Sequence, residues 1–69
     1  MDFKSAGKKI RQALRMKHIT QASLGKAIGI SAAFVGHIER GTRVHSVSTL
    51  YSICKRLDIS MDYVVGLTK

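Results

Sequence analysis

Hydrophobic residues recur along the chain at intervals of three and four, which is the spacing of amphipathic α-helices. Gly, Ser and Thr interrupt this pattern at several points, and no proline breaks any segment from within. The expected helices cover about residues 3–17, 21–28 and 32–40, followed by two segments that start after Ser46 and after Ser60. The pattern therefore predicts an all-α fold, a compact bundle of about five short helices.

The middle of the chain contains the signals that start and stop two adjacent helices. Thr20 and Ser31 are favoured N-cap residue types, and Gly29 and Gly41 are suited to end the helices that precede them. Only Gly29 and Ile30 separate the two helices, a connection too short for antiparallel stacking. We therefore expect the helices to cross steeply, as in a helix-turn-helix that covers about residues 20–40.

One face of each helix is expected to supply the hydrophobic core. Cys54 lies within such an apolar pattern, so we interpret it as a small core residue rather than a redox switch. The other predicted core positions are Ala6, Ile10, Ala13, Leu14, Leu24, Ala27, Ile28, Val35, Ile38, Leu50, Ile53, Leu57, Met61, Val64, Val65 and Leu67, whereas Gly36 is assigned to a face outside the core.

The charge balance points to a polyanionic partner. The chain has 12 Lys and Arg against 4 Asp and Glu, a formal net charge of +8 at pH 7, which suits nucleic acid or an acidic membrane surface. Lys4, Lys8, Arg11 and Arg15 form a basic stripe along the first helix, either a contact surface or a solvated face.

Several classes of protein are not expected. The chain has no apolar run of the roughly 20 residues that span a bilayer and no apolar leader, so we expect a cytoplasmic protein without a membrane partner. Its single cysteine and scattered acidic residues offer no disulfide, metal site or paired catalytic groups, so neither an enzyme nor a cofactor is expected. Residues 1–69 are predicted to form one domain, with no pocket for a small-molecule effector.

The segment TQASLGKAIGISAAFVGHIERGT, residues 20–42, resembles the helix-turn-helix of the Xre family, the lambda-repressor and Cro-like DNA-binding domains. Gly25 stands where that family usually has alanine, which implies a close approach of the two helices at this point. The flanking segments GKKIRQALRMKHIT and STLYSICKRLDISMDYVVGL resemble the family's remaining helices. The motif positions are Thr20, Gln21, Leu24, Gly25, Gly29, Ile30, Ser31, Val35, Ile38, Glu39 and Gly41.

The resemblance implies a transcriptional regulator that binds double-stranded DNA, with the third helix in the major groove and the second crossing the phosphate backbone. Ala32 and Ala33 depart from the long polar residues common in the family and are suited to thymine methyl groups. His37 is expected to donate to a guanine or a phosphate, or else to be solvated. The resemblance also implies that Phe34 packs inward, since the family often has an inward-packing aromatic residue at this position. The expected DNA-contacting residues are Gln21, Ser31, Ala32, Ala33, His37, Arg40, Thr42 and Arg43.

Glu39 corresponds to the family's acidic partner of an arginine in the first helix. Leu14 occupies the place where many relatives have that arginine, so Arg11 or Arg15 has to substitute for it. The sequence leaves the choice between these two arginines open.

The last segment, residues 59–67, is more apolar than one face against a small core requires. We expect Tyr63 and Leu67 to form a two-fold interface of a homodimer that binds a palindromic operator, unless the segment only completes the core. Two other functions remain open: a protein-interaction module of the same fold, such as an antitoxin, and a non-specific polyanion binder.

Overall fold

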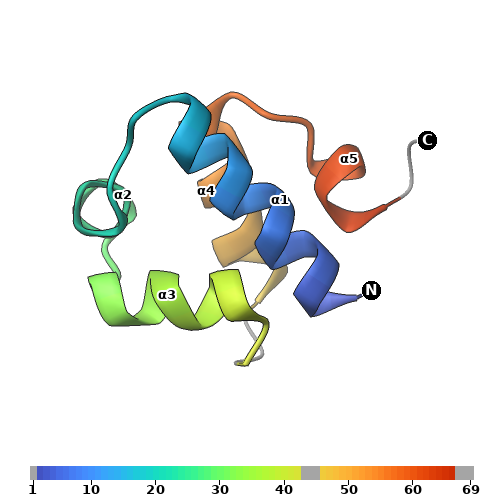
Figure 1. Cartoon of the computed structure of the whole chain (residues 1–69), viewed down its shortest axis with the longest axis horizontal. Helices are drawn as coiled ribbons and strands as arrows, with labels where there is room; N and C mark the ends of the chain where they lie inside the picture. The colour runs from blue at the N-terminus through green and yellow to red at the C-terminus, as the bar shows by residue number, and fades with distance from the viewer. Residues whose placement is uncertain (1, 43–45, 67–69) are drawn as a thin grey trace.

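The computed structural model describes residues 2–42 and 46–66 of the chain. Within these ranges the secondary structure is helical and includes no strand. The helices are α1 (Phe3–Met16), α2 (Gln21–Ile28), α3 (Ala32–Arg40), α4 (Val47–Leu57) and α5 (Met61–Val65). The all-α prediction is thus confirmed, and the predicted bounds of the first three helices differ by one residue at most. In Figure 1, α1 lies in front of α4, α2 and α5 flank them, and α3 runs along the lower edge.

Hydroxyl side chains begin four of the five helices, at the positions that the sequence predicted. The oxygens of Thr20, Ser31, Ser46 and Ser60 accept hydrogen bonds from the backbone N–H groups of Ser23, Phe34, Thr49 and Tyr63. Each such cap contributes about 1 kcal/mol to helix stability. The cap of α1, which the sequence analysis did not identify, is Asp2, whose carboxylate accepts from the N–H groups of Lys4 and Ser5.

The helices end in the left-handed backbone conformation. Gly29 and Gly41 adopt φ values of 81° and 69°, as expected for residues without a Cβ. The turns after α1 and α4 use His18 and Asp58 instead, with φ values of 56° and 55°. These two residue types tolerate positive φ better than most others, so the chain turns there without glycine.

The core consists of twelve hydrophobic residues of low exposure, to which all five helices contribute. They are Ala6, Ile10, Ala13, Leu14, Leu24, Val35, Ile38, Leu50, Ile53, Cys54, Leu57 and Val64, all predicted core positions. Ile28, Phe34, Met61 and Val65 are only partly buried against this cluster, and Leu67 lies outside the described residues.

One burial prediction was wrong. Ala27 is exposed, because the buried face of α2 is centred between Leu24 and Gly25 and, at 100° per residue, Ala27 lies about 110° from that centre. Gly36 lies outside the core cluster, as expected, but it is buried, because the side chains of Arg40 and Gln21 cover it.

Two glycines allow backbones to approach closely. A Cβ on Gly25 would lie 2.4 Å from the carbonyl oxygen of Ile30, so the expected close approach exists, although it involves the backbone of the turn. Gly7, which the sequence analysis did not single out, allows a closer contact between distant segments. A Cβ there would lie 2.4 Å from the carbonyl oxygens of both Ile38 and Glu39 at the end of α3. These contacts fix where α3 lies relative to α1.

None of the helices in residues 2–42 and 46–66 is long and apolar enough to cross a membrane.

The contact at Gly7 predicts opposite effects for two glycine substitutions. Gly7→Ala should lower the free energy of unfolding by about 1–3 kcal/mol, because overpacking against rigid backbone outweighs the helix propensity of alanine. Gly36→Ala is the matched control, since its Cβ would lie 3.2 Å from the mobile end of Arg40; its stability should be unchanged or higher by up to about 1 kcal/mol. Urea denaturation measures both, and a Gly7→Ala protein as stable as wild type would disprove the constraint.

Candidate nucleic-acid interface

The residues expected to touch DNA lie along α3 and at the start of α2. Ser31, Ala33, Arg40 and Thr42 are exposed, Gln21 is exposed at the first position of α2, and Ala32 and His37 are half-buried. Arg43 lies outside the described residues. The structure therefore brings together the described members of the predicted set on α3 and the adjoining end of α2.

The outer face of α3 carries a shallow apolar hollow of about 460 Å³. Ile30, Ala33 and Phe34 supply its apolar surface, and Ser31 and His37 supply its polar groups. Phe34 was expected to pack inward; it does pack against the core, but it also lines this hollow. The face thus combines apolar surface with hydrogen-bonding groups.

His37 is held by its neighbours on one side of the ring. Its Nδ1 lies 3.1 Å from Oγ1 of Thr42 and 3.4 Å from Nη2 of Arg40. The Thr42 hydroxyl also donates a hydrogen bond of 3.3 Å to the carbonyl oxygen of His37. These contacts orient the imidazole at the end of α3, next to the apolar hollow.

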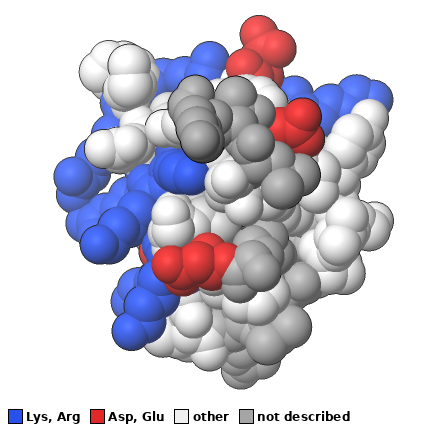
Figure 2. Space-filling model, turned by 90° about the vertical axis from the view of Figure 1, so that its right-hand side faces the viewer, with Lys and Arg blue, Asp and Glu red and all other residues white. Residues whose placement is uncertain are grey.

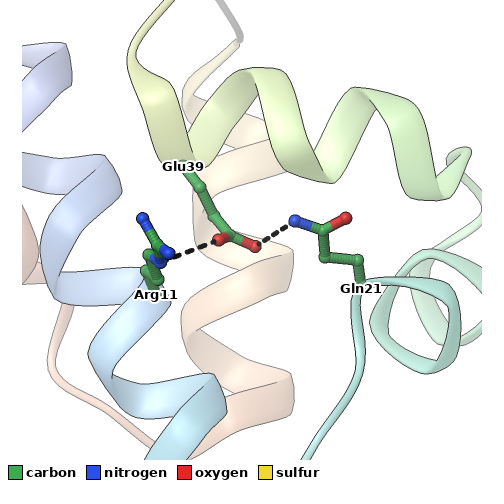
Figure 3. A network of polar contacts seen from close by, with 3 residues as sticks. All are labelled: Arg11, Gln21 and Glu39. Carbon is green, nitrogen blue, oxygen red and sulfur yellow. Dashed lines mark hydrogen bonds and ion pairs between the residues drawn. The ribbon is translucent and has the colours of Figure 1, made fainter.

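A single carboxylate connects three helices. Nε2 of Gln21 donates a hydrogen bond of 3.0 Å to Oε2 of Glu39, and Nε of Arg11 lies 3.9 Å from Oε1 of the same residue. Figure 3 shows Arg11 and Gln21 on either side of Glu39. The partner that the sequence left open is therefore Arg11. Glu39 is almost buried, with 9% of its side chain exposed, whereas 55% of the Arg11 side chain is exposed.

A second hollow, of about 530 Å³, lies at the N-terminal end of α2. Arg11, Arg15 and His18 line it together with Thr20 and Gln21. The carboxylate of Glu39 also lines the hollow, but Arg11 and Gln21 pair with it. The charge of Arg15 and the partial positive charge of the helix N-terminus therefore still favour an anion. The sequence analysis did not assign Arg15 and His18 to the site. Arg15 is the last residue of the basic stripe on α1, and α2 follows α1 in the chain, so the stripe was the available signal for Arg15.

The remaining candidate chemistry is limited. Cys54 is buried, and burial raises the pKa of its thiol, which disfavours a reactive thiolate. Over residues 2–42 and 46–66 there is no group of three or more His, Cys, Asp or Glu side chains that could hold a metal ion.

One of the two residues expected at a dimer interface, Tyr63, lies within the described part of the chain. Tyr63 on α5 is 45% exposed, and the ammonium group of Lys9 lies 4.9 Å from the centre of its ring. Leu67 lies outside the described residues.

The chain is similar to known helix-turn-helix proteins. The family profile described as "Helix-turn-helix" matches residues 10–64. The uncharacterized HTH-type transcriptional regulator YazB of Bacillus subtilis is 37% identical over 62 residues, which cover 90% of this chain and 90% of that protein.

Two solved structures show the same fold. The restriction-modification controller protein C.AhdI from Aeromonas hydrophila has a TM-score of 0.84 at 27% identity, covering 91% of this chain and 96% of that one. The P22 c2 repressor in complex with a synthetic operator has a TM-score of 0.80 at 32% identity, covering 86% and 89% of the two chains. The fold is thus lambda-repressor-like, as the sequence resemblance implied.

The geometry around Glu39 predicts unequal effects for its removal and that of its arginine partner. Glu39→Ala should lower the free energy of unfolding by about 1–2 kcal/mol, because a nearly buried acceptor of a charge-assisted hydrogen bond is lost. Arg11→Ala should cost less than about 1 kcal/mol, because the Arg11 side chain is largely exposed. Thermal and urea denaturation measure both values.

A double-mutant cycle distinguishes the two arginines. Glu39→Ala should show a coupling energy with Arg11→Ala and none above about 0.3 kcal/mol with the control Arg15→Ala. A larger coupling with Arg15 would contradict the observed pairing.

Proposed function

Because the chain belongs to the helix-turn-helix family of Cro/C1 type, a class of DNA-binding regulators rather than enzymes, we propose that it binds specific double-stranded DNA sequences and regulates transcription. The observation that carries the proposal is the outer face of α3, where an apolar hollow adjoins the imidazole of His37 and the hydroxyl of Ser31. The net charge of +8 adds a general attraction to DNA.

In this proposal α3 lies in the major groove and reads base edges. The methyl groups of Ala32 and Ala33 contact thymine methyl groups, and the hollow beside Ala33 is apolar enough to receive one. A ring N–H group of His37 donates to a guanine N7 or O6, or to a phosphate. Two short alanine side chains also allow α3 to approach the bases closely.

Phosphate contacts surround this base-reading face. One amide hydrogen of Gln21 is used by Glu39, and the other is free to bind a phosphate at the N-terminus of α2. Ser31 accepts a hydrogen bond as the N-cap of α3, and its own hydroxyl proton remains available for donation. We assign the remaining contacts with the DNA phosphates to Arg40, Thr42 and Arg43. We add Arg15 and His18 to this set, because they line the hollow beside Gln21.

We further propose that residues 1–69 act as one domain, as a homodimer in the cytoplasm. One recognition helix covers few base pairs, so two copies on half-sites about 34 Å apart along a palindromic operator provide the specificity of a regulator. Tyr63, exposed on α5, and Leu67 are assigned to the two-fold interface. Regulation then depends on protein concentration, a partner protein or competition at the operator, without a small-molecule effector.

The proposal predicts preferential binding to a regulatory site. A labelled duplex from the region upstream of the protein's own gene should bind about 10³-fold more tightly than a scrambled duplex of equal composition at near-physiological salt. Fluorescence anisotropy at two salt concentrations measures this ratio. Equal affinities that fall together as salt rises would indicate a non-specific polyanion binder, and weak binding to both would favour a protein-interaction module.

The proposed contact with thymine methyl groups is tested by removing the methyl group from the DNA base or from Ala33. Replacing a contacted thymine of the mapped operator with uracil should weaken binding about fourfold, because burial of one methyl contributes about 0.8 kcal/mol. The same replacement should have no further effect on Ala33→Gly, which lacks the partner methyl. Uracil at a position outside the footprint is the control, and an undiminished effect in Ala33→Gly would contradict the assigned contact.

A further inference from the structure

An apolar groove lies between α1 and α5, away from the candidate DNA interface. Ala13 and Met16 of α1 line it on one side, and Ile59 and Tyr63 on the other, with a volume of about 370 Å³. Met16 is 81% exposed, the highest value among the exposed large hydrophobic residues of the described chain. This surface shares no lining residue with the hollows at α3 and at the start of α2. In Figure 1, α5 and the C-terminal part of α1 lie above α3.

Lysines stand at the two ends of the α1 side of the groove. Lys9 and Lys17 both line it, and their separation of eight residues corresponds to about 12 Å along the helix axis. Figure 2, which looks onto the α5 side of the molecule, shows a large group of Lys and Arg side chains at the left and a smaller one at the upper right, with Asp and Glu side chains beside both groups. The groove thus combines an apolar floor with positive charge at its rim.

The interactions of the two lysines differ. Nζ of Lys9 donates a hydrogen bond of 2.8 Å to the carbonyl oxygen of Tyr63 and lies over its ring, so it holds α5 against α1 and keeps two hydrogens for another acceptor. Lys17 follows the last residue of α1 and is exposed. Asp58 and Asp62 precede Ile59 and Tyr63 in the chain, but neither lines the groove. An incoming carboxylate therefore meets lysines rather than other carboxylates.

We propose that this groove binds an acidic amphipathic helix of another protein. The apolar side chains of such a helix, at positions i, i+3 or i+4 and i+7, would enter between Met16 and Tyr63. Its flanking carboxylates would pair with Lys9 and Lys17. Methionine adapts its shape to different apolar partners, so Met16 suits this role. The groove volume lies at the lower end of the range for binding pockets, about 300–1,000 Å³, and accommodates a few side chains.

The two-fold interface proposed above shares Tyr63 with this groove, so a second copy and an acidic helix would compete for it. The second copy fits the groove less well. In a two-fold arrangement centred on the groove, the same surface meets itself, so Lys9 and Lys17 of one copy face the same lysines of the other. The chain has only 4 acidic residues against 12 basic ones, which favours an acidic partner over another basic chain. The inference does not depend on DNA binding, because the DNA contacts assigned above lie elsewhere.

The test uses the full chain and a fluorescein-labelled helical peptide of 15 residues or so, with Leu and Phe on one face and Glu on the other. A scrambled peptide of identical composition is the control for charge alone. The test protein is the double variant Met16→Glu, Lys17→Glu. Its matched control is Tyr51→Glu, Lys55→Glu, which makes the same charge changes at exposed residues of α4. Circular dichroism checks that both variants remain folded.

The amphipathic peptide should bind wild type and the α4 variant with similar affinity and bind the groove variant at least about tenfold more weakly. The scrambled peptide should bind wild type at least about tenfold more weakly than the amphipathic one. Equal losses in both variants, equal binding of both peptides, or no measurable binding to wild type would overturn the proposal. Light scattering tests whether a second copy of the chain occupies the groove. If wild type is a homodimer that only the groove variant converts to monomer, the groove binds a second copy and the proposal is overturned.

Discussion

The backbone contact between α1 and the end of α3 is the constraint on which the rest of the structure depends. At Gly7 the helix α1 comes so close to α3 that a Cβ would overlap two carbonyl oxygens, and close packing of backbone against backbone leaves little room for adjustment. Gly41 adds to the contact, since its own Cβ would lie 2.8 Å from Cα of Lys4. Together these glycines determine how far α3 stands from the core and which of its faces remains outside.

The polar network around Glu39 follows from that position. Once the end of α3 lies against α1, the carboxylate of Glu39 is within reach of Arg11, and its other oxygen accepts from Gln21 at the start of α2. The same carboxylate therefore links the helix that carries the proposed base contacts to the residue that carries a proposed phosphate contact. Its low exposure strengthens the hydrogen bond relative to one at the surface, which orients the Gln21 amide before any ligand arrives.

The two sides of the molecule have different chemistry. The side formed by α3 and the start of α2 presents small side chains, hydrogen-bond donors and two arginines in the hollow beside Gln21, a combination suited to DNA. The groove between α1 and α5 presents a larger apolar surface with lysines at its rim, a combination suited to an acidic helix. The helix α1 contributes to both sides, with Arg11 beside Gln21 and with Ala13 and Met16 in the groove.

The sequence by itself determined the local structure. Helices, their hydroxyl N-caps and the turn at Gly29 depend on residues within four positions of one another, so their signals are contiguous in the chain. The family resemblance extended this to the lambda-repressor-like arrangement and the candidate residues of α3. Only the tertiary structure decided that Arg11 rather than Arg15 pairs with Glu39, that Gly36 is covered and Ala27 exposed, and that Arg15 and His18 join Gln21. Each of these outcomes depends on distances between different helices. The packing of whole helix faces sets those distances, and hydrophobic periodicity alone does not specify that packing.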